Sequence, residues 1–164
     1  MSRSLLALAA VLLAGCATHF TNVLQVAPGT PRDAVLARAG QPTRVVPLAG
    51  GGQRLQYSLQ PMGRFAFMVD LDPAGRVTRV RQALTASEFH RIEEGRWSRA
   101  DVEREFGPPA WIDGVARWDG TVMTYRWMDA DRSDMFYWVY LDRQDVVRRA
   151  HPGMEFVNAP NDRN

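Results

Sequence analysis

The chain has 164 residues, of which 46% are hydrophobic and 23% charged, and its formal net charge at pH 7 is +2. This length suits one modest domain, and the single cysteine excludes an intramolecular disulfide. Every basic residue is an arginine, and the arginines alternate with acids. The sequence therefore lacks the stripe of unopposed cations that a nucleic-acid-binding surface needs.

The N-terminus has the three regions of a secretory signal. Arg3 supplies a positive charge, residues 5–13 form an apolar run, and Ala14-Gly15 provides small residues directly before Cys16. A helix of residues 5–13 spans about 13 Å, against about 30 Å for the hydrocarbon core of a bilayer. The pattern predicts a targeting segment rather than a membrane span.

Leu13-Ala14-Gly15-Cys16 resembles the lipobox of bacterial lipoproteins. The resemblance implies that residues 1–15 are a signal peptide and that Cys16 becomes a lipidated N-terminus, carrying acyl chains such as palmitate that tether the protein to a membrane. Ala17, where an Asp would favour the inner membrane, implies the outer membrane with the protein facing the periplasm. The alternative is an ordinary secreted protein in which Cys16 has no role.

The rest of the chain matches itself at an offset of about 67 to 70 residues. "PGTPRDAVLARAGQPTRV" aligns with "EGRWSRADVEREFGPPAWI", and "FAFMVDLDPAGRVTRV" aligns with "FYWVYLDRQDVVRRA". Ordered self-similarity predicts a duplicated unit, with a first repeat at residues 16–84, a second at 85–154 and a flexible tail at 155–164.

Each repeat is predicted to begin with helices. Thr30 and Ser98 are expected N-caps, and Gly40 and Gly107 are expected C-terminal caps. A further capping pattern predicts a helix over residues 85–95, and its shorter counterpart in the first repeat would lie within residues 20–26.

Period-two alternation and turn residues predict three or four antiparallel strands after the helices of each repeat. A unit of about sixty residues is marginal alone, so the two repeats are expected to share one continuous sheet or core. The predicted fold is therefore α+β, with two tandem helix-helix-antiparallel-sheet repeats.

The first repeat resembles the SmpA/OmlA (BamE-like) family of outer-membrane assembly lipoproteins. The matching residues are Gly29-Thr30, Gly40-Gln41-Pro42, Tyr57 and residues 71–77. The second repeat departs from the pattern at Arg96 and Asp145, which replace the Thr and the hairpin Gly. The tandem layout is similar to that of beta-lactamase-inhibitor-like proteins.

The resemblance implies a protein-binding accessory of outer-membrane or envelope assembly, whose partner is another envelope protein such as a component of the outer-membrane assembly machinery. The doubled architecture implies an alternative, an inhibitor or regulator of a periplasmic hydrolase.

No catalytic, metal or cofactor site is predicted, and the protein is not expected to be an enzyme. His90 and Glu94 share a helix face but have no evident third metal ligand. Asp70 and Asp72 lead into a turn, residues 129–134 lack the spacing of a calcium loop, and the glycines at 50–52 precede no Lys-Ser/Thr.

A partner-binding face is predicted on the second repeat. Its third strand alternates so that Phe136, Trp138 and Tyr140 lie opposite the core-facing residues, with Arg126 on the neighbouring strand. Aromatic residues and arginine dominate binding hot spots. The alternative is that a second sheet or the C-terminal tail covers this face.

Overall fold

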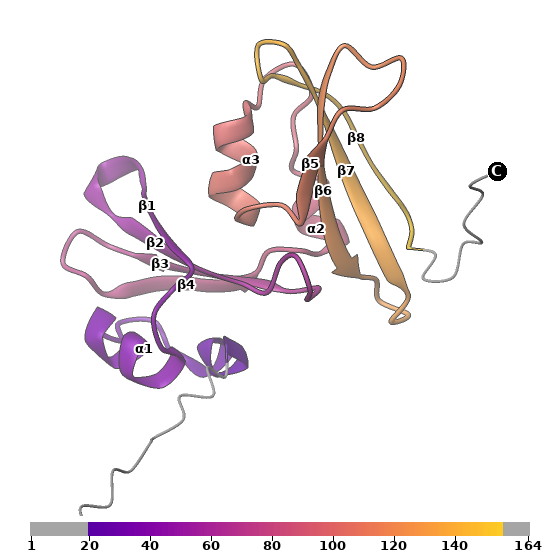
Figure 1. The fold of residues 1–164 in the computed structure, drawn as a ribbon. Coiled ribbons are helices and arrows are strands. Elements are labelled where there is room, and N and C mark those ends of the chain that lie inside the picture. The colour runs from indigo at the N-terminus through magenta and orange to yellow at the C-terminus, as the bar shows by residue number, and fades with distance from the viewer. Residues whose placement is uncertain (1–19, 156–164) are drawn as a thin grey trace, which may run out of the picture.

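The computed structural model describes residues 20–155, which form a mostly β protein with eight strands in two separate antiparallel sheets (Figure 1). The predicted signal peptide, Cys16 and the tail from residue 156 lie outside the described residues. No helix in the described part of the chain is both long and apolar enough to cross a membrane.

The first half contains two short helical segments and a sheet with the strand order β1-β2-β3-β4. Its elements are η1 (Phe20–Gln25), α1 (Arg32–Ala39), β1 (Arg44–Pro47), η2 (Ala49–Gly51), β2 (Gln53–Ser58), β3 (Ala66–Leu71) and β4 (Val77–Gln82).

The second half has the strand order β5-β6-β7-β8. Its elements are α2 (Ala86–Phe89), α3 (Arg99–Phe106), β5 (Trp111–Asp113), β6 (Gly120–Met128), β7 (Asp134–Asp142) and β8 (Val147–Met154).

The prediction of an α+β fold of helix-helix-sheet repeats is wrong. Helix is a minor part of the chain, because α1 and α3 have eight residues each and α2 has four. The helix expected over residues 85–95 ends at Phe89. Beyond it, hydrogen bonds between residues i and i−3, such as Ile92 N to Phe89 O, replace the α-helical pattern. The halves also form two sheets and two hydrophobic clusters rather than one continuous sheet or core.

Equivalent hydrogen bonds nevertheless recur in the two halves. The Tyr57 hydroxyl donates to Gly40 O at 3.1 Å, and the Tyr125 hydroxyl donates to Gly107 O at 2.9 Å. Both glycines end a helix at positive φ, as their predicted role as C-terminal caps requires. A buried tyrosine that holds the end of a helix is thus a shared feature of both halves.

Of the two predicted N-caps, Ser98 is confirmed and Thr30 is wrong. Ser98 forms a capping box with Asp101, which confirms that prediction. Thr30 does not cap α1, because the N-cap is Pro31 and the Thr30 hydroxyl instead donates to Ala27 O at 2.7 Å.

Strand alternation decides which residues of β3 and β7 enter the two cores. Phe67, Val69 and Leu71 of β3 pack in one cluster with residues of η1 and α1. Tyr137, Val139 and Leu141 of β7 pack in the other cluster, which also contains residues of α2 and α3. Because Ala66 and Met68 of β3 join this second cluster, α3 lies between the two sheets (Figure 1).

Side chains from other segments cover backbone groups at both edges of the second sheet. The Gln60 amide donates to Arg126 O at 2.7 Å and accepts from Arg126 N at 3.1 Å, beyond the last pair that β5 makes with β6. At the opposite edge, the Glu94 carboxylate accepts from Ala150 N of β8 at 2.9 Å. Gln60 therefore substitutes for a neighbouring strand and also links the two halves.

Candidate functional site

The outer face of the second sheet, the one turned away from α3, carries aromatic side chains from several strands. The antiparallel register places Trp138 of β7 opposite both Thr124 of β6 and His151 of β8. The same register pairs Phe136 with Arg126, and Tyr140 with Arg149. Successive residues of a strand point to opposite faces, so these side chains gather on one side of the sheet.

Six rings on this face form a continuous chain of contacts, which we call the aromatic face. Neighbouring ring centroids along it are between 5.2 and 5.8 Å apart, within the range of favourable aromatic pairs. In order of contact, its members are Trp111, Phe136, Trp138, His151, Tyr140 and Trp118.

The rings cover the sheet and remain partly open to solvent. Val122 and Thr124, which lie between the aromatic strand positions, are each only 2% exposed. Trp111 is 38% exposed, and the other rings are half-buried. No element of residues 20–155 packs over this face in Figure 1, where α2 and α3 lie on the other side of the sheet. The rings therefore form the outer layer of the described protein.

Local features fix the orientation of two of the tryptophans. A side chain at Gly153 would place its Cβ 2.2 Å from the ring of Trp138, so this glycine makes room for the indole. Trp118 lies in the connection between β5 and β6, and its Nε1 donates to Leu141 O at 2.8 Å. These side chains are held in place before any partner arrives, which lowers the entropic cost of binding.

The two arginines at this face have different surroundings. The guanidinium of Arg149 lies 5.4 Å from the centre of the Tyr140 ring, close enough for a cation–π interaction, and the residue is exposed. Arg126 instead forms a bidentate ion pair with Glu155, and it donates to the carbonyls of Pro61 and Met62 at 3.4 Å each. Arg126 is therefore engaged within the protein, and Arg149 is the exposed cation of the aromatic face.

The structure thus brings Phe136, Trp138 and Tyr140 together, as the sequence predicts, and places Arg126 at the margin. Sequence reasoning missed Trp111, Trp118 and His151. The internal repeat could have placed Trp111 on a strand, because Trp111 begins β5, the counterpart of β1 in the first half. Trp118 lies in a connection without alternation, and no sequence pattern places it over Tyr140.

The corresponding face of the first sheet is buried against α3. Ala66 and Met68 are 0% exposed there. The Gln56 amide donates to Glu103 O at 2.9 Å, and Arg54 donates to Arg104 O at 3.0 Å. Carbonyl groups in the last turn of a helix favour cations and hydrogen-bond donors, and Arg54 and Gln56 of this face supply both to α3.

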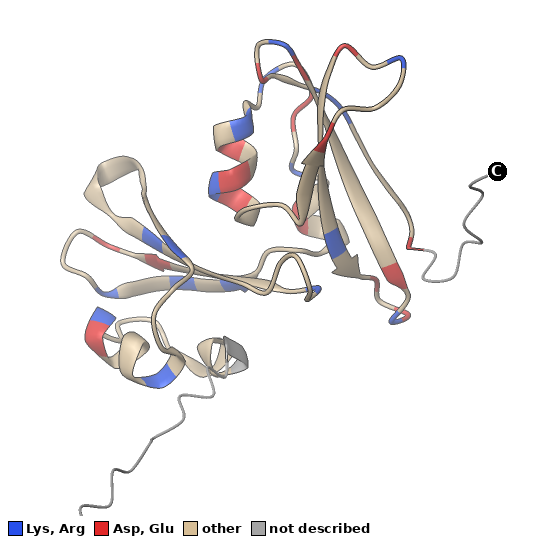
Figure 2. Cartoon of the chain, viewed as in Figure 1, with Lys and Arg blue, Asp and Glu red and all other residues tan. Residues whose placement is uncertain are grey.

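An ion-pair network strengthens this junction, where arginines and acids are mixed along α3 and the first sheet (Figure 2). Glu105 of α3 lies 2.9 Å from Arg54 and 2.7 Å from Arg81. Burial disfavours the charged Glu105 carboxylate, but Arg54, Arg81 and Arg91 outweigh burial and hold the pKa of Glu105 below its usual value. Burial and the neighbouring Arg54 lower the pKa of Arg81 to about 10, which leaves it charged at neutral pH.

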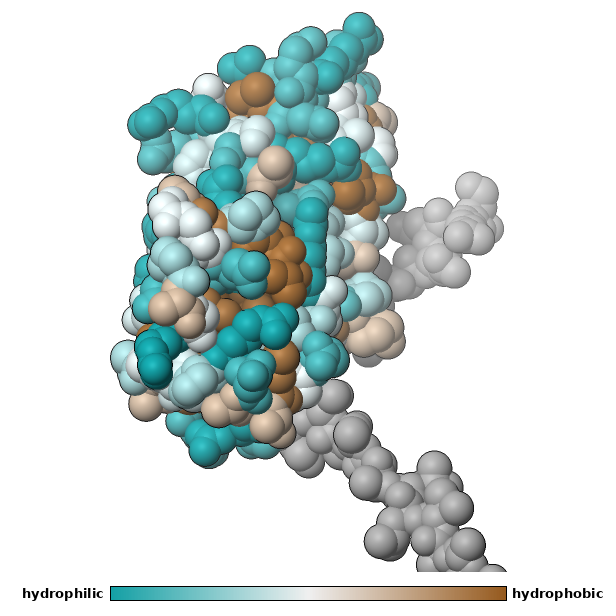
Figure 3. Space-filling model, turned by 90° about the vertical axis from the view of Figure 1, so that its left-hand side faces the viewer, coloured by the Kyte–Doolittle hydropathy of each residue, from teal (hydrophilic) through white to brown (hydrophobic). Residues whose placement is uncertain are grey.

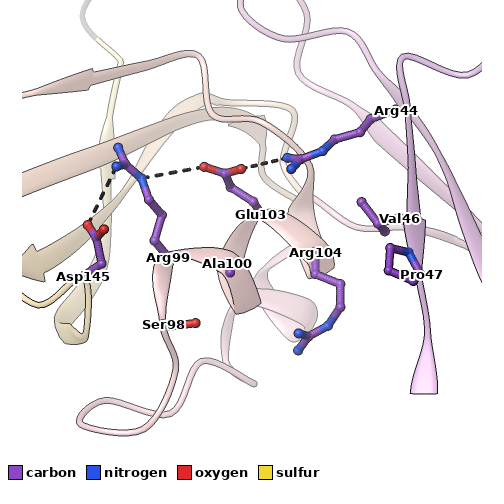
Figure 4. A pocket seen from close by; sticks show the side chains of 9 residues that line it. All are labelled: Arg44, Val46, Pro47, Ser98, Arg99, Ala100, Glu103, Arg104 and Asp145. Carbon is purple, nitrogen blue, oxygen red and sulfur yellow. Dashed lines mark hydrogen bonds and ion pairs between the residues drawn. The ribbon is translucent and has the colours of Figure 1, made fainter.

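A cleft of about 460 Å³ lies beside this junction, between β1 and α3 (Figure 4). Its charges compensate one another: Arg44 is 2.7 Å from Glu103, and Arg99 is 3.7 Å from both Glu103 and Asp145. Seen from the side of α3 and β1, the molecule shows an apolar area bordered by hydrophilic residues (Figure 3). The cleft offers no carboxylate isolated in an apolar setting, which general acid–base chemistry at neutral pH would require.

The remaining sequence candidates are dispersed. His90 is exposed at the end of α2, and Glu94 is engaged with the backbone of β8. Asp72 accepts from Arg76 N at 2.8 Å in the β3–β4 turn. Within residues 20–155, no three His, Cys, Asp or Glu side chains are grouped as metal ligands would be.

Comparisons with known proteins establish no family. No family model matches the chain, and no curated protein matches it. Among solved structures, it is similar to a DUF4309 family protein (YjgB) from Bacillus subtilis, with 15% identity and a TM-score of 0.33 over 77% of this chain and 79% of the other. It is also similar to an extracellular protein containing a SCP domain from Bacillus anthracis, with 15% identity and a TM-score of 0.32 over 84% of this chain and 46% of the other.

Proposed function

We propose that this protein is a non-enzymatic binding module, anchored in the outer membrane through lipid on Cys16 and facing the periplasm, which holds another envelope protein on its aromatic face. The observation that supports it most is the chain of six partly exposed rings on a sheet face that no described element covers. Contiguous exposed apolar surface on a folded protein commonly marks an interaction site.

The composition of the face favours a protein as the partner. Tryptophan, tyrosine and arginine are the residues most enriched among interface hot spots, because they bury a large area with few rotatable bonds. The aromatic face combines three tryptophans and a tyrosine with the exposed cation of Arg149. The resemblance of the sequence to assembly lipoproteins suggests a role as an accessory of outer-membrane assembly.

The test compares capture of partners from membranes by the lipidated protein and by a Phe136→Ser, Trp138→Ser double variant. A matched control is Val45→Ser, which changes an exposed apolar residue on an edge strand of the other sheet. We expect the double variant to lose the partner while it stays cooperatively folded, with a melting temperature only modestly below that of the control. Unchanged capture would contradict the proposal, and so would a collapse of stability, which would identify the rings as core.

The identity of the captured partner decides the role. Components of the outer-membrane assembly machinery would support the assembly role. A soluble hydrolase retained by the same rings would replace that role with one in regulation, and labelling with radioactive palmitate tests the anchor at Cys16.

A further inference from the structure

The distance between the proposed lipid anchor and the folded protein is short. Only residues 17–19 separate Cys16 from Phe20, where η1 begins. Even a fully extended chain covers about 14 Å over these four steps. A lipid on Cys16 therefore holds the start of η1 within about 14 Å of the bilayer surface.

The segment after the anchor is part of the folded body rather than a linker. Val23 and Val26, in and directly after η1, are 0% and 6% exposed and pack in the hydrophobic cluster of the first sheet. Arg38 of α1 donates to Gln25 O at 3.1 Å, which ties η1 to α1. The short tether consequently restrains the orientation of the whole first half.

From this geometry we propose that the surface formed by η1 and α1 lies against the headgroups of the anchoring membrane, while the second half stands away from the bilayer. The inference depends on the lipidation of Cys16 in the proposed function. It adds a membrane-contact surface and an orientation, neither of which is needed for partner binding itself.

The exposed side chains of this surface suit a membrane with anionic lipids. Leu24 of η1 is 54% exposed and follows Cys16 by eight residues in the sequence. Arg38 is exposed, and Arg76 is held nearby through its contact with Gly29 O at 3.2 Å. Each arginine near an anionic bilayer contributes about 1 kcal/mol of attraction, and an exposed leucine can enter the interface.

The orientation follows from which element covers which face of the first sheet. η1 and α1 cover one face, and α3 covers the other (Figure 1). With η1 and α1 on the membrane, the second half lies on the far side of the first sheet. The aromatic face then turns sideways into the periplasm, where a membrane-bound or soluble partner can reach it.

The test uses the fact that Cys16 is the only cysteine. Under the proposed function its thiol carries lipid and does not react with a label. A second cysteine, introduced as Leu24→Cys or Val115→Cys, then accepts a fluorophore at one site. Val115 is a matched control because it is 43% exposed and lies in the β5–β6 connection of the second half. Each labelled, lipidated protein is reconstituted into vesicles of phosphatidylethanolamine and phosphatidylglycerol that contain a lipid with a nitroxide-labelled headgroup.

We expect the nitroxide lipid to quench the label at position 24 several-fold more than the label at position 115. Insertion of twelve Gly and Ser residues after Ala17 extends the reach by about 20 Å and should reduce this difference. Equal quenching at both positions would overturn the inference, as would stronger quenching at position 115. Loss of the Phe136 and Trp138 effect on capture would contradict the proposed function instead, without altering the quenching pattern.

Discussion

The two sheets share strand order and backbone hydrogen bonds but differ on one face. The positions of Ala66, Met68 and Asp70 in β3 correspond to those of Phe136, Trp138 and Tyr140 in β7. In the first sheet, small or flexible side chains let α3 approach, and Arg54, Gln56 and Arg81 bind the carbonyl groups at its end. In the second sheet, bulky rings occupy these positions and face solvent. Substitutions on one sheet face thus decide whether that face becomes a junction inside the protein or an outer surface.

The largest expected effect comes from breaking the junction at Glu105. In Glu105→Gln, Arg54 and Arg81 keep their buried positions but lose the carboxylate that both contact. Removing one partner of a buried ion pair costs about 3–5 kcal/mol, so the free energy of unfolding in urea should fall by about that amount. Glu103→Gln, which removes the partly exposed pairs with Arg44 and Arg99, should cost at most about 1 kcal/mol. Equal losses in the two variants would show that the network does not hold the junction.

The same residue predicts how stability depends on pH. Because the folded protein holds the pKa of Glu105 below its usual 4.5, the stabilisation from this group is fully present above pH 4.5. It is lost as the pH falls through the lower pKa of the folded state. Urea titrations between pH 7 and pH 3 should therefore show a smaller acid-dependent loss of stability in Glu105→Gln than in the natural chain. An identical loss in both proteins would refute this assignment.

A direct comparison of the two faces uses the corresponding residues Met68 and Trp138. Met68→Ala leaves a cavity beneath α3 and should cost about 2–4 kcal/mol. Trp138→Ala removes a larger side chain but one that is already partly solvated, so its cost should be only about 1–2 kcal/mol. Thermal unfolding of both variants measures the difference. A greater loss for Trp138→Ala would mean that the aromatic face is part of a core.

The tyrosines that hold the helix ends provide a test of what the halves share. Tyr57→Phe and Tyr125→Phe each remove one hydrogen bond to a glycine carbonyl, at a cost of about 1 kcal/mol in the free energy of unfolding. Burial raises the pKa of Tyr57 to about 12 and raises that of Tyr125 well above its usual value. Neither hydroxyl is therefore expected to ionise at neutral pH. Widely different losses would indicate that the two hydrogen bonds are not equivalent.

The smallest expected effect concerns the two strand turns. Asp145 has φ 58° where the first half has Gly75 with φ 73°. An aspartate tolerates this left-handed region less well than glycine, so Asp145→Gly should stabilise the protein by about 0.5 kcal/mol. The loss of its 3.7 Å pair with the half-buried Arg99 should offset little of this gain, because Asp145 itself is exposed. A lower melting temperature would show that the Arg99 pair outweighs the backbone preference.

The sequence was informative where local chemistry decides the structure. Alternation separated the two faces of β7, and the expected N-cap at Ser98 located the start of α3. It failed where tertiary contacts decide. The capping pattern at Thr85 opens only a four-residue helix, because a cap signals where a helix begins but not how far packing extends it.

The candidate site was predicted in the same partial way. Phe136, Trp138 and Tyr140 share a face because a strand alternates, and this follows from the sequence alone. Their contact with Trp118 and His151, and the engagement of Arg126 by Glu155, depend on how distant segments meet. The burial of Ala66 and Met68 likewise depends on α3, which follows them by more than thirty residues.

The side chains of Gln60 and Glu94 at the margins of the second sheet have a consequence for self-association. An exposed edge strand offers unpaired backbone groups with which a second copy of the chain can pair. The hazard grows with the local concentration that the proposed membrane anchor would produce. The Gln60 side chain is hydrogen-bonded to the backbone N–H and C=O of Arg126 at one edge. The Glu94 carboxylate accepts from the Ala150 amide at the other edge. Another copy of the chain therefore finds no free backbone groups at these points, which disfavours edge-to-edge polymerisation.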